Sequence, residues 1–222
     1  MDGRHEVKYF VSISDCALLR TRLKAVAKPD TYAVADGTYA VRSLYFDNYM
    51  DKAVTEKLSG QSRREKFRLR VYNKDSSFIR LEKKSKANQL TYKESVTITP
   101  IQCMSLLSGD YDWLRTAEVA ILNELYSKVR YQILRPKNIV DYTREAYIFP
   151  AGNVRVTFDS NIRTSNNISG FLNPNLTTIP SAGAMVMEVK FDNFLPDIIR
   201  DILQIGWHAQ TEFSKYVSAR LI

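Results

Sequence analysis

The chain has 222 residues, of which 45% are hydrophobic and 11% aromatic, a composition that excludes a disordered polypeptide and leaves ample material for a core. Lysine and arginine outnumber aspartate and glutamate by 32 to 24, so the formal net charge is +8. This charge points to an anionic partner, and nucleic acid, an acidic membrane surface and phosphorylated metabolites all fit it.

The first thirty residues contain no apolar segment long enough for a signal peptide, and no run approaches the roughly 20 apolar residues of a membrane span. We therefore expect a cytoplasmic protein without a membrane span. Cys16 and Cys103 fall in stretches with helical periodicity and are expected to be buried free thiols. His5 and His208 lie far apart, so no cluster of Cys and His ligands is expected.

Eight strand-like segments follow one another along the chain, and most of them alternate apolar with polar residues. They cover residues 4–12, 39–47, 64–73, 77–86, 91–99, 140–149, 153–163 and 184–192. Helical patterns separate them at residues 12–28, 99–107, 115–129, 195–206 and 211–222. No linker or repeat interrupts the chain, so one domain spanning residues 1–222 is expected.

Some local details follow from the same patterns. The first helix is expected to begin at Ser14 or Asp15, and the second at the pair Thr99-Pro100. Residues 164–183 are rich in Asn, Ser, Gly and Pro, which predicts a mobile loop.

In most of the predicted strands the charged residues are mainly cations, and they lie on one face of the strand. In "KFRLRVY" (residues 66–72) the cations Lys66, Arg68 and Arg70 alternate with apolar residues, so they project from one side of the strand. Almost every other predicted strand likewise has an apolar face and a face with at least one Lys or Arg. A solvated outer face explains any single strand of this kind. Because cations recur on one face of seven strands, the pattern favours an anion that all of these strands bind together.

Amphipathic helices need the apolar strand faces for burial, which places the charged faces on the other side of the sheet. The sequence therefore predicts an α+β fold, a closed antiparallel eight-stranded tunnel barrel with helices packed on its outside. A dry lumen with so many cations is excluded by the desolvation cost, so the lumen must be wet and hold a dense anion. An open basic sheet that stacks RNA bases on Tyr45, Tyr72 and Tyr142 is the alternative, but no RNA-binding motif accompanies it and no nucleic-acid partner is expected.

The order of several short segments resembles the VTC-type domains, the polyphosphate-polymerase branch of the triphosphate tunnel metalloenzyme (CYTH-like) superfamily. The segments are "RHEVKYFV", "VRSLYFDN", "RREKFRLRVYN", "IRLEKKSK", "YKESVTIT", "YTREAY", "VRVTFDSNIR", "MEVKFDNFLPDIIR" and "FSKYVSARL". Each is weak alone, and nine in the correct order are specific. The resemblance runs from about residue 3 to the end of the chain.

The resemblance implies a basic tunnel that binds a triphosphate and threads polyphosphate, with catalysis by a set of cations. Matched to the family positions, they are Lys8, Arg68, Arg70, Lys84, Lys93, Arg144, Arg155 and Lys215, together with Lys190, which shares the face of the metal ligand. Of these, Lys8, Arg68, Arg70 and Arg144 are assigned to the nucleotide. The family's metal-binding carboxylate falls on Glu188, which would hold Mn²⁺ or Mg²⁺.

Simpler roles remain open for some of these residues. Glu188 could serve only as the counter-ion of Lys190, and Lys215 could lie at the surface. Glu6 and Glu82 look like partners that orient cations. Related hydrolases open with Glu-x-Glu-x-Lys, whereas this chain reads Arg4, Glu6 and Lys8, an exchange expected to replace a metal ligand by a phosphate contact.

The expected activity is a metal-dependent phosphotransferase that moves the γ-phosphate of ATP to a growing polyphosphate chain. A tunnel triphosphatase acting on nucleoside triphosphate or inorganic triphosphate, and a non-catalytic polyphosphate- or nucleotide-binding module, are the alternatives. Eukaryotic polymerases of the family carry an inositol-phosphate-sensing domain and membrane helices. Neither is present in this sequence, so we expect a bacterial homologue with a separate membrane partner. The sequence sets no oligomeric state.

Overall fold

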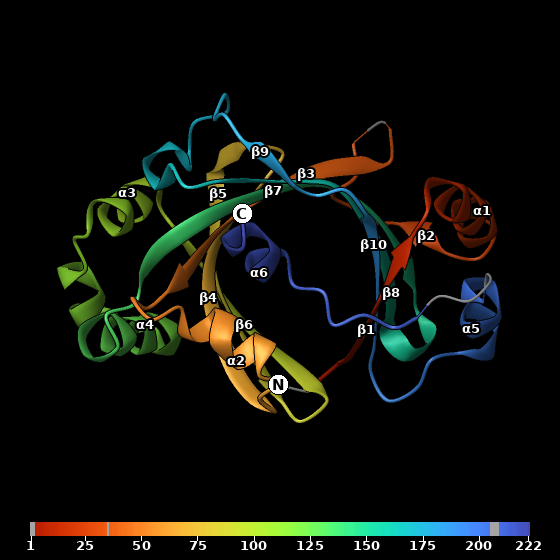
Figure 1. Ribbon diagram of the computed structural model, residues 1–222, viewed down its shortest axis with the longest axis horizontal. Coiled ribbons are helices and arrows are strands. Elements are labelled where there is room, and N and C mark those ends of the chain that lie inside the picture. Colours follow the sequence, from red (N-terminus) through yellow and green to blue (C-terminus); the bar gives the residue numbers. More distant parts are fainter. Residues whose placement is uncertain (1–2, 35, 205–208) are drawn as a thin grey trace.

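One antiparallel sheet curves around a central space in the computed structural model, which describes residues 3–34, 36–204 and 209–222 (Figure 1). Eight strands follow the order β1-β10-β8-β7-β3-β4-β5-β6, while β2 pairs with β7 and β9 pairs with β8. The strands are β1 (His5–Val11), β2 (Lys28–Pro29), β3 (Thr38–Asp47), β4 (Arg63–Tyr72), β5 (Asp75–Ala87), β6 (Leu90–Ile98), β7 (Arg135–Phe149), β8 (Val154–Ser165), β9 (Ile179–Ala182) and β10 (Met185–Phe191).

Helices fill the connections between strands. The α-helices are α1 (Ile13–Lys24), α2 (Lys52–Leu58), α3 (Pro100–Ser108), α4 (Ala120–Tyr131), α5 (Asp197–Leu203) and α6 (Lys215–Arg220). Three short 3₁₀ helices complete the set: η1 (Asp112–Thr116), η2 (Ala151–Asn153) and η3 (Ile168–Gly170). Within the described residues, every helix is too short or too polar to cross a membrane.

The two outer strands of the path, β1 and β6, meet at one point. The backbone N–H groups of Arg4 and Thr91 each donate to the other residue's carbonyl oxygen at 2.9 Å, which makes a single antiparallel bridge. No hydrogen-bonded ladder joins β1 to β6 in the described part of the chain. An antiparallel α+β fold is thus confirmed, and complete closure of the predicted barrel is not.

The apolar strand faces point outward and are covered by helices, as the alternation predicts. One cluster packs α3, η1 and α4 against β3, β4 and β5, with Leu44, Leu69 and Leu81 at its centre. A second cluster packs α1 and α5 against β1, β8 and β10. Figure 1 shows these two helical layers at opposite ends of the molecule, both outside the curve of the sheet. The buried, free thiols of Cys16 and Cys103 belong to these outer clusters, as expected.

Helix α6 corrects the prediction that all helices lie outside. It sits within the curve of the sheet (Figure 1). Its Tyr216, Val217 and Ala219 pack on inward-facing apolar side chains of β3, β7 and β8, such as Val41 and Val140. In this part of the sheet the inner face is apolar and not charged. The six-residue helix α6 packs on that apolar part. One part of the interior is therefore an apolar core, and the rest is charged.

Several boundaries also differ from the predictions. Helix α1 is capped by Ser12 instead of Ser14 or Asp15, because Ser12 Oγ accepts from Asp15 N at 3.0 Å while the Asp15 carboxylate accepts from Ser12 N at 3.3 Å. Thr99 and Pro100 begin α3 as predicted. Helix α4 begins at Ala120, since residues 112–116 form a 3₁₀ helix.

The C-terminal half shows the remaining differences. Helix α5 ends at Leu203, and its predicted end at Gly206 lies outside the described residues. Residues 164–183 are only partly a loop, because β8 continues to Ser165 and β9 pairs with it. The short elements β2 and α2 carry no periodic signal and were not predicted.

Candidate active site

A cavity of about 420 Å³ occupies the charged part of the interior. Eleven cations and two carboxylates, Glu6 and Glu188, are among its lining residues. All nine cations predicted for the site line it, as does Glu188. They come from β1, β4, β5, β6, β7, β8, β10 and the start of α6, so residues more than 200 positions apart in sequence converge on one space: Lys8, Arg68, Arg70, Lys84, Lys93, Arg144, Arg155, Lys190 and Lys215.

Strand register accounts for this convergence. On one side of the cavity Lys8 lies opposite Glu188, and Lys190 lies opposite Arg155. On the other side Lys84 of β5 lies opposite Lys66 of β4 and Lys93 of β6. Like charges directly opposite one another destabilise a sheet. A row of three lysines therefore indicates a face that is built to meet an anion.

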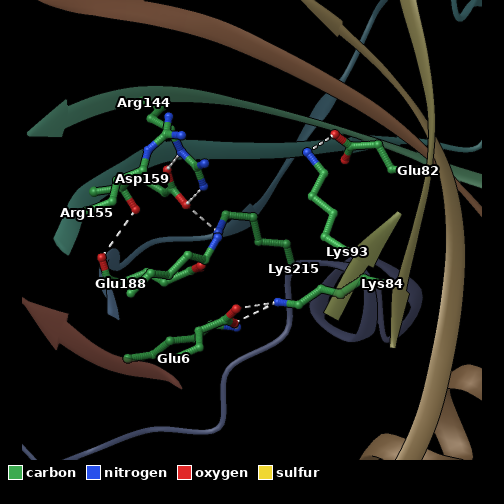
Figure 2. Close-up of polar contacts among 12 residues, drawn as sticks. Glu6, Glu82, Lys84, Lys93, Arg144, Arg155, Asp159, Glu188 and Lys215 are labelled. Atoms are coloured by element: carbon green, nitrogen blue, oxygen red, sulfur yellow. Dashed lines mark hydrogen bonds and ion pairs between the residues drawn. The ribbon is translucent and has the colours of Figure 1, made fainter. Parts of the chain in front are cut away.

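Glu82 is the centre of one group of cations. Its carboxylate lies 2.7 Å from the Arg68 guanidinium, 3.5 Å from Arg70 and 2.5 Å from Lys93 Nζ (Figure 2 shows the Lys93 contact). Arg70 also donates to Ser43 Oγ and to the Tyr142 hydroxyl, both at 3.1 Å. Burial alone would raise the pKa of Glu82, but the three cations lower it below its usual range. Glu82 is therefore ionised and orients the two arginines, in agreement with the role inferred from sequence.

Asp159 is the centre of a second group, which is drawn in Figure 2. Arg144 binds it in a bidentate manner at 2.6 and 2.7 Å, and Lys215 Nζ lies 2.5 Å from the same carboxylate. Burial opposes ionisation, yet Arg144 and Lys215 lower the pKa of Asp159 to about 2. The Lys215 side chain is only 9% exposed, so the surface position considered for it is wrong.

Replacing Asp159 with asparagine is expected to destabilise the empty protein. It would leave Arg144 and Lys215 without their buried counter-ion, and breaking such a group costs about 3 kcal/mol. An added polyanion can neutralise both cations, so tripolyphosphate should raise the melting temperature of the variant more than that of the wild type. Thermal unfolding with and without tripolyphosphate measures both effects. Equal shifts in the two proteins would contradict the prediction.

Two carboxylates face each other across the remaining part of the cavity. Glu188 lies 2.7 Å from Lys190 Nζ, and Glu6 lies 2.5 and 2.8 Å from Lys84 Nζ and 3.1 Å from Lys8 Nζ (Figure 2 shows Glu6 and Lys84). Burial raises the pKa of each carboxylate, and the surrounding lysines outweigh it and lower both values. Both groups are thus ionised, and Glu188 is near enough to act against the lowering of the Glu6 pKa.

A divalent cation would find few protein ligands here. Among the described residues no group of three or more His, Cys, Asp or Glu side chains could hold a metal ion. Mg²⁺ commonly binds through one or two carboxylates and completes its shell with water and substrate phosphates. Glu188, with Glu6 near it, fits that mode and does not fit a metal held by the protein alone.

Lys66 and Tyr45 are cavity residues that the sequence interpretation did not assign to the site. No carboxylate of the described residues forms an ion pair with Lys66, whose Nζ lies 5.5 Å from the centre of the Tyr45 ring. Burial, together with Lys8 and Arg68, lowers the pKa of Lys66 to about 8. Burial opposes ionisation of Tyr45, but Arg68 and Lys66 lower its pKa to about 7. Lys66 shares the parity of Arg68 and Arg70, a signal that was present in the sequence.

Polyanion binding is therefore expected to take up protons near pH 8. In the empty cavity Lys66 is partly neutral at this pH, and a bound anion raises its pKa again. The affinity of the wild type for tripolyphosphate should fall, relative to that of a Lys66→Arg variant, as the pH rises through about 8. Calorimetry in two buffers of different ionisation heat measures the proton uptake. Identical uptake by the variant would contradict this role, because the ligand's own titration is common to both proteins.

The geometry argues against the open basic sheet that would stack RNA bases. Tyr72 is half-buried and its ring already stacks on that of Tyr32, with centroids 5.0 Å apart. Tyr45 and Tyr142 are 3% and 4% exposed, so neither offers a free face for stacking RNA bases. Most of the charged strand faces line a recessed cavity instead of an outer surface. Arg4 also lines the cavity, and its guanidinium forms an ion pair with Asp192 at 2.8 Å and donates to the carbonyl oxygen of Asn153. A phosphate contact for Arg4 stays a prediction. The remaining cations of the cavity still outnumber the carboxylates that contact them.

An antiparallel sheet wrapped around a cation-rich cavity is the architecture that defines this protein. The profile of the VTC domain matches residues 3–222, and the chain belongs to this family. The resemblance seen in the sequence is thereby confirmed. No curated protein matches the chain.

Solved structures resemble the chain at low sequence identity. A candidate adenylate cyclase from Bacillus halodurans is 14% identical, with a TM-score of 0.53 over 91% of this chain and 87% of that one. A protein from Pyrococcus horikoshii OT3 is 12% identical, with a TM-score of 0.48 over 98% of both chains. The Mimivirus capping enzyme triphosphatase is 8% identical, with a TM-score of 0.42 over 92% of this chain and 91% of that one. Of these three, the likeness to the Bacillus halodurans protein, with its TM-score of 0.53, supports a shared fold.

Proposed function

We propose that this protein is a polyphosphate polymerase that transfers the γ-phosphate of ATP to the end of a polyphosphate chain. The observation that carries the proposal is the excess of cations over carboxylates in one recessed cavity. These cations are contributed by strands from the whole length of the chain. Only a ligand with many closely spaced charges neutralises such a set. A nucleoside triphosphate and a polyphosphate chain both have this property, and membership of the VTC-domain family agrees with it.

The reaction breaks the bond between the γ-phosphorus and the oxygen that bridges it to the β-phosphate, and forms a bond to a terminal oxygen of the chain. ADP leaves, and the chain grows by one phosphate. The terminal phosphate is already ionised near neutral pH, so its attack requires no general base. Catalysis then consists of positioning the two phosphates in line and stabilising the charge that spreads over the transferred group.

The cations have different tasks in this proposal. Arg68, Arg70 and Arg155 offer the remaining N–H groups of their guanidinium planes to phosphate oxygens. Buried Glu82 orients the first two, and buried Asp30 forms an ion pair with Arg155. Arg144 uses its fork on Asp159, so it contributes charge to the cavity together with Lys215. The lysines, which bind phosphate as point charges, complete the path: Lys8, Lys84, Lys93 and Lys190.

A divalent ion, Mg²⁺ or Mn²⁺, would be held by Glu188, with Glu6 near it. Such an ion supplies Lewis-acid charge at the phosphate oxygens when it is bound. In its absence Lys190 and Lys84 neutralise these two carboxylates. Both carboxylates are therefore ionised and ready to accept a metal that arrives with the nucleotide.

Incubation of the pure protein with ATP and Mn²⁺, followed by separation of the products, tests the proposal. Chains of phosphate together with ADP are the expected products. Free phosphate alone would identify a triphosphatase, and unchanged ATP with a raised melting temperature would identify a binding module. A location in the cytoplasm and a separate membrane partner stay predictions from the sequence.

A further inference from the structure

The inner face of β4 changes character at the C-terminal end of the strand. Lys66, Arg68 and Arg70 are followed on the same face by Tyr72, which also lines the central cavity. The guanidinium carbon of Arg70 lies 6.0 Å from the centre of the Tyr72 ring. An aromatic ring offers no positive charge to phosphate, so this end of the cavity suits a different part of a ligand.

Tyr72 belongs to a group of three tyrosines, Tyr32, Tyr39 and Tyr72, which we call the tyrosine cluster. The rings of Tyr32 and Tyr72 stack with centroids 5.0 Å apart and an interplanar angle of 13°. The Tyr39 ring is tilted against both, with its centroid 6.2 Å from that of Tyr32 and 6.1 Å from that of Tyr72. Tyr39 is buried and Tyr72 half-buried, whereas Tyr32 is 43% exposed. Tyr32 is therefore the outer member of the cluster, and part of its surface is open to solvent.

The backbone at Tyr32 is held in place by Asp30. The Asp30 carboxylate accepts from the Tyr32 N–H at 3.2 Å and from the Tyr39 hydroxyl at 3.3 Å, and it forms an ion pair with the cavity residue Arg155. The Asp30 N–H donates to the carbonyl oxygen of Ala146 on β7 at 2.9 Å. The position of the Tyr32 ring relative to the cavity is thus fixed before any ligand arrives, so a group that stacks on it need not pay for ordering it.

The ligand that fits this arrangement joins a dense anion to a flat ring. A phosphate bound at Arg70 would lie one side-chain contact from Tyr72, and Tyr72 is in contact with Tyr32. In a nucleoside triphosphate, the ribose and the α-phosphate separate the base from the β- and γ-phosphates, which need the cations. Nucleobases stack on exposed aromatic side chains. Inorganic triphosphate and polyphosphate have no group that can use such a ring.

We propose that the exposed face of Tyr32 stacks the base of the nucleotide whose triphosphate lies in the central cavity. Tyr72 supports the Tyr32 ring from the other side. The inference rests on the proposed function, because it takes a nucleoside triphosphate as the substrate. It adds a base subsite, by which the protein binds a nucleotide more tightly than inorganic triphosphate. None of the residues predicted for catalysis, nucleotide or metal belongs to the tyrosine cluster.

Calorimetric titration with a non-hydrolysable ATP analogue and with tripolyphosphate tests this proposal. Tyr32→Leu keeps an apolar cover over Tyr72 and removes the aromatic face, so it should weaken binding of the ATP analogue about tenfold and leave tripolyphosphate binding unchanged. Tyr32→Phe keeps the ring and should bind both ligands as the wild type does. Tyr131→Leu, which removes an exposed tyrosine of α4 that does not line the cavity, is the matched control and should change neither ligand.

Tyr32→Trp provides a direct reporter of stacking. The ATP analogue should quench the fluorescence of this variant beyond the quenching seen in the wild type, whose own two tryptophans give the background, and tripolyphosphate should not. Equal quenching by the two ligands would overturn the proposal. So would an equal loss of affinity for both ligands in Tyr32→Leu, which would mean that Tyr32 only supports the cavity, or an unchanged affinity for the ATP analogue.

These outcomes are independent of the reaction. A protein in which Tyr32→Leu weakens nucleotide binding alone, but which forms no polyphosphate from ATP, would contradict the polymerase function and retain the base subsite. Polyphosphate formation by a protein whose nucleotide affinity does not depend on Tyr32 would retain the function and remove the subsite.

Discussion

Replacement of Arg70 with alanine is expected to lower turnover about 100- to 1,000-fold with little loss of stability. Arg70 presents a guanidinium to the cavity, and removal of one preorganised donor from a charged transition state has an effect of this size. The fold tolerates the change because Glu82 keeps Arg68 and Lys93 as partners. Repulsion between Arg68 and Arg70 is relieved at the same time. The expected loss is about 1 kcal/mol.

Product formation from ATP and the melting temperature measure the two parts of this prediction. Arg115→Ala, which removes an exposed arginine of η1, is the control and should leave both unchanged. A melting temperature lowered by ten degrees or more would mean, by a rough conversion, that Arg70 supports the fold. Full activity in the variant would exclude the cavity as the site of phosphoryl transfer.

Replacement of Glu188 with glutamine is expected to reduce metal-dependent activity to background, a loss of at least about 100-fold. The amide keeps the shape of the side chain and removes the charge that a divalent cation requires. Lys190 loses its partner at 2.7 Å but remains near Glu6, so the protein should stay folded. Titration with Mn²⁺ in the presence of a non-hydrolysable ATP analogue should show weaker metal binding.

Glu118→Gln serves as the control, because Glu118 is exposed and does not line the cavity. Metal binding that is equal in wild type and Glu188→Gln would show that Glu188 is only the counter-ion of Lys190. In that case the polyphosphate site could persist, with the metal bound by phosphate alone.

Strand alternation made much of this fold predictable. A period of two in "KFRLRVY" separates Arg68 and Arg70 from Phe67 and Leu69 whatever the partner strands are, and the structure places the first pair at the cavity and the second in the outer core. Amphipathic helices such as α4 had to cover the apolar faces. Eight strand segments and the sign of their charges were therefore accessible from the sequence.

Features that depend on contacts between distant residues could not be obtained in this way. Helix α6 resembles any short amphipathic segment, and only the inward apolar face of β3 and β7 brings it inside the sheet. The pairing of Glu212 with Lys57 joins residues 155 positions apart. Sequence periodicity predicts on which face of a strand or helix a side chain lies. It does not predict which distant residue that side chain contacts. Lys66 shared the strand face of Arg68 in the sequence. That no carboxylate of residues 3–34, 36–204 and 209–222 forms an ion pair with it became visible only in the structure.

A crystal structure of the protein with Mn²⁺ and a non-hydrolysable ATP analogue tests the central claim most directly. The account predicts that the triphosphate lies in the central cavity, with its oxygens within hydrogen-bond distance of Arg68, Arg70 and Lys66 and the metal beside Glu188. A triphosphate bound on the outer surface, with these side chains still held by their carboxylates or by water, would contradict it.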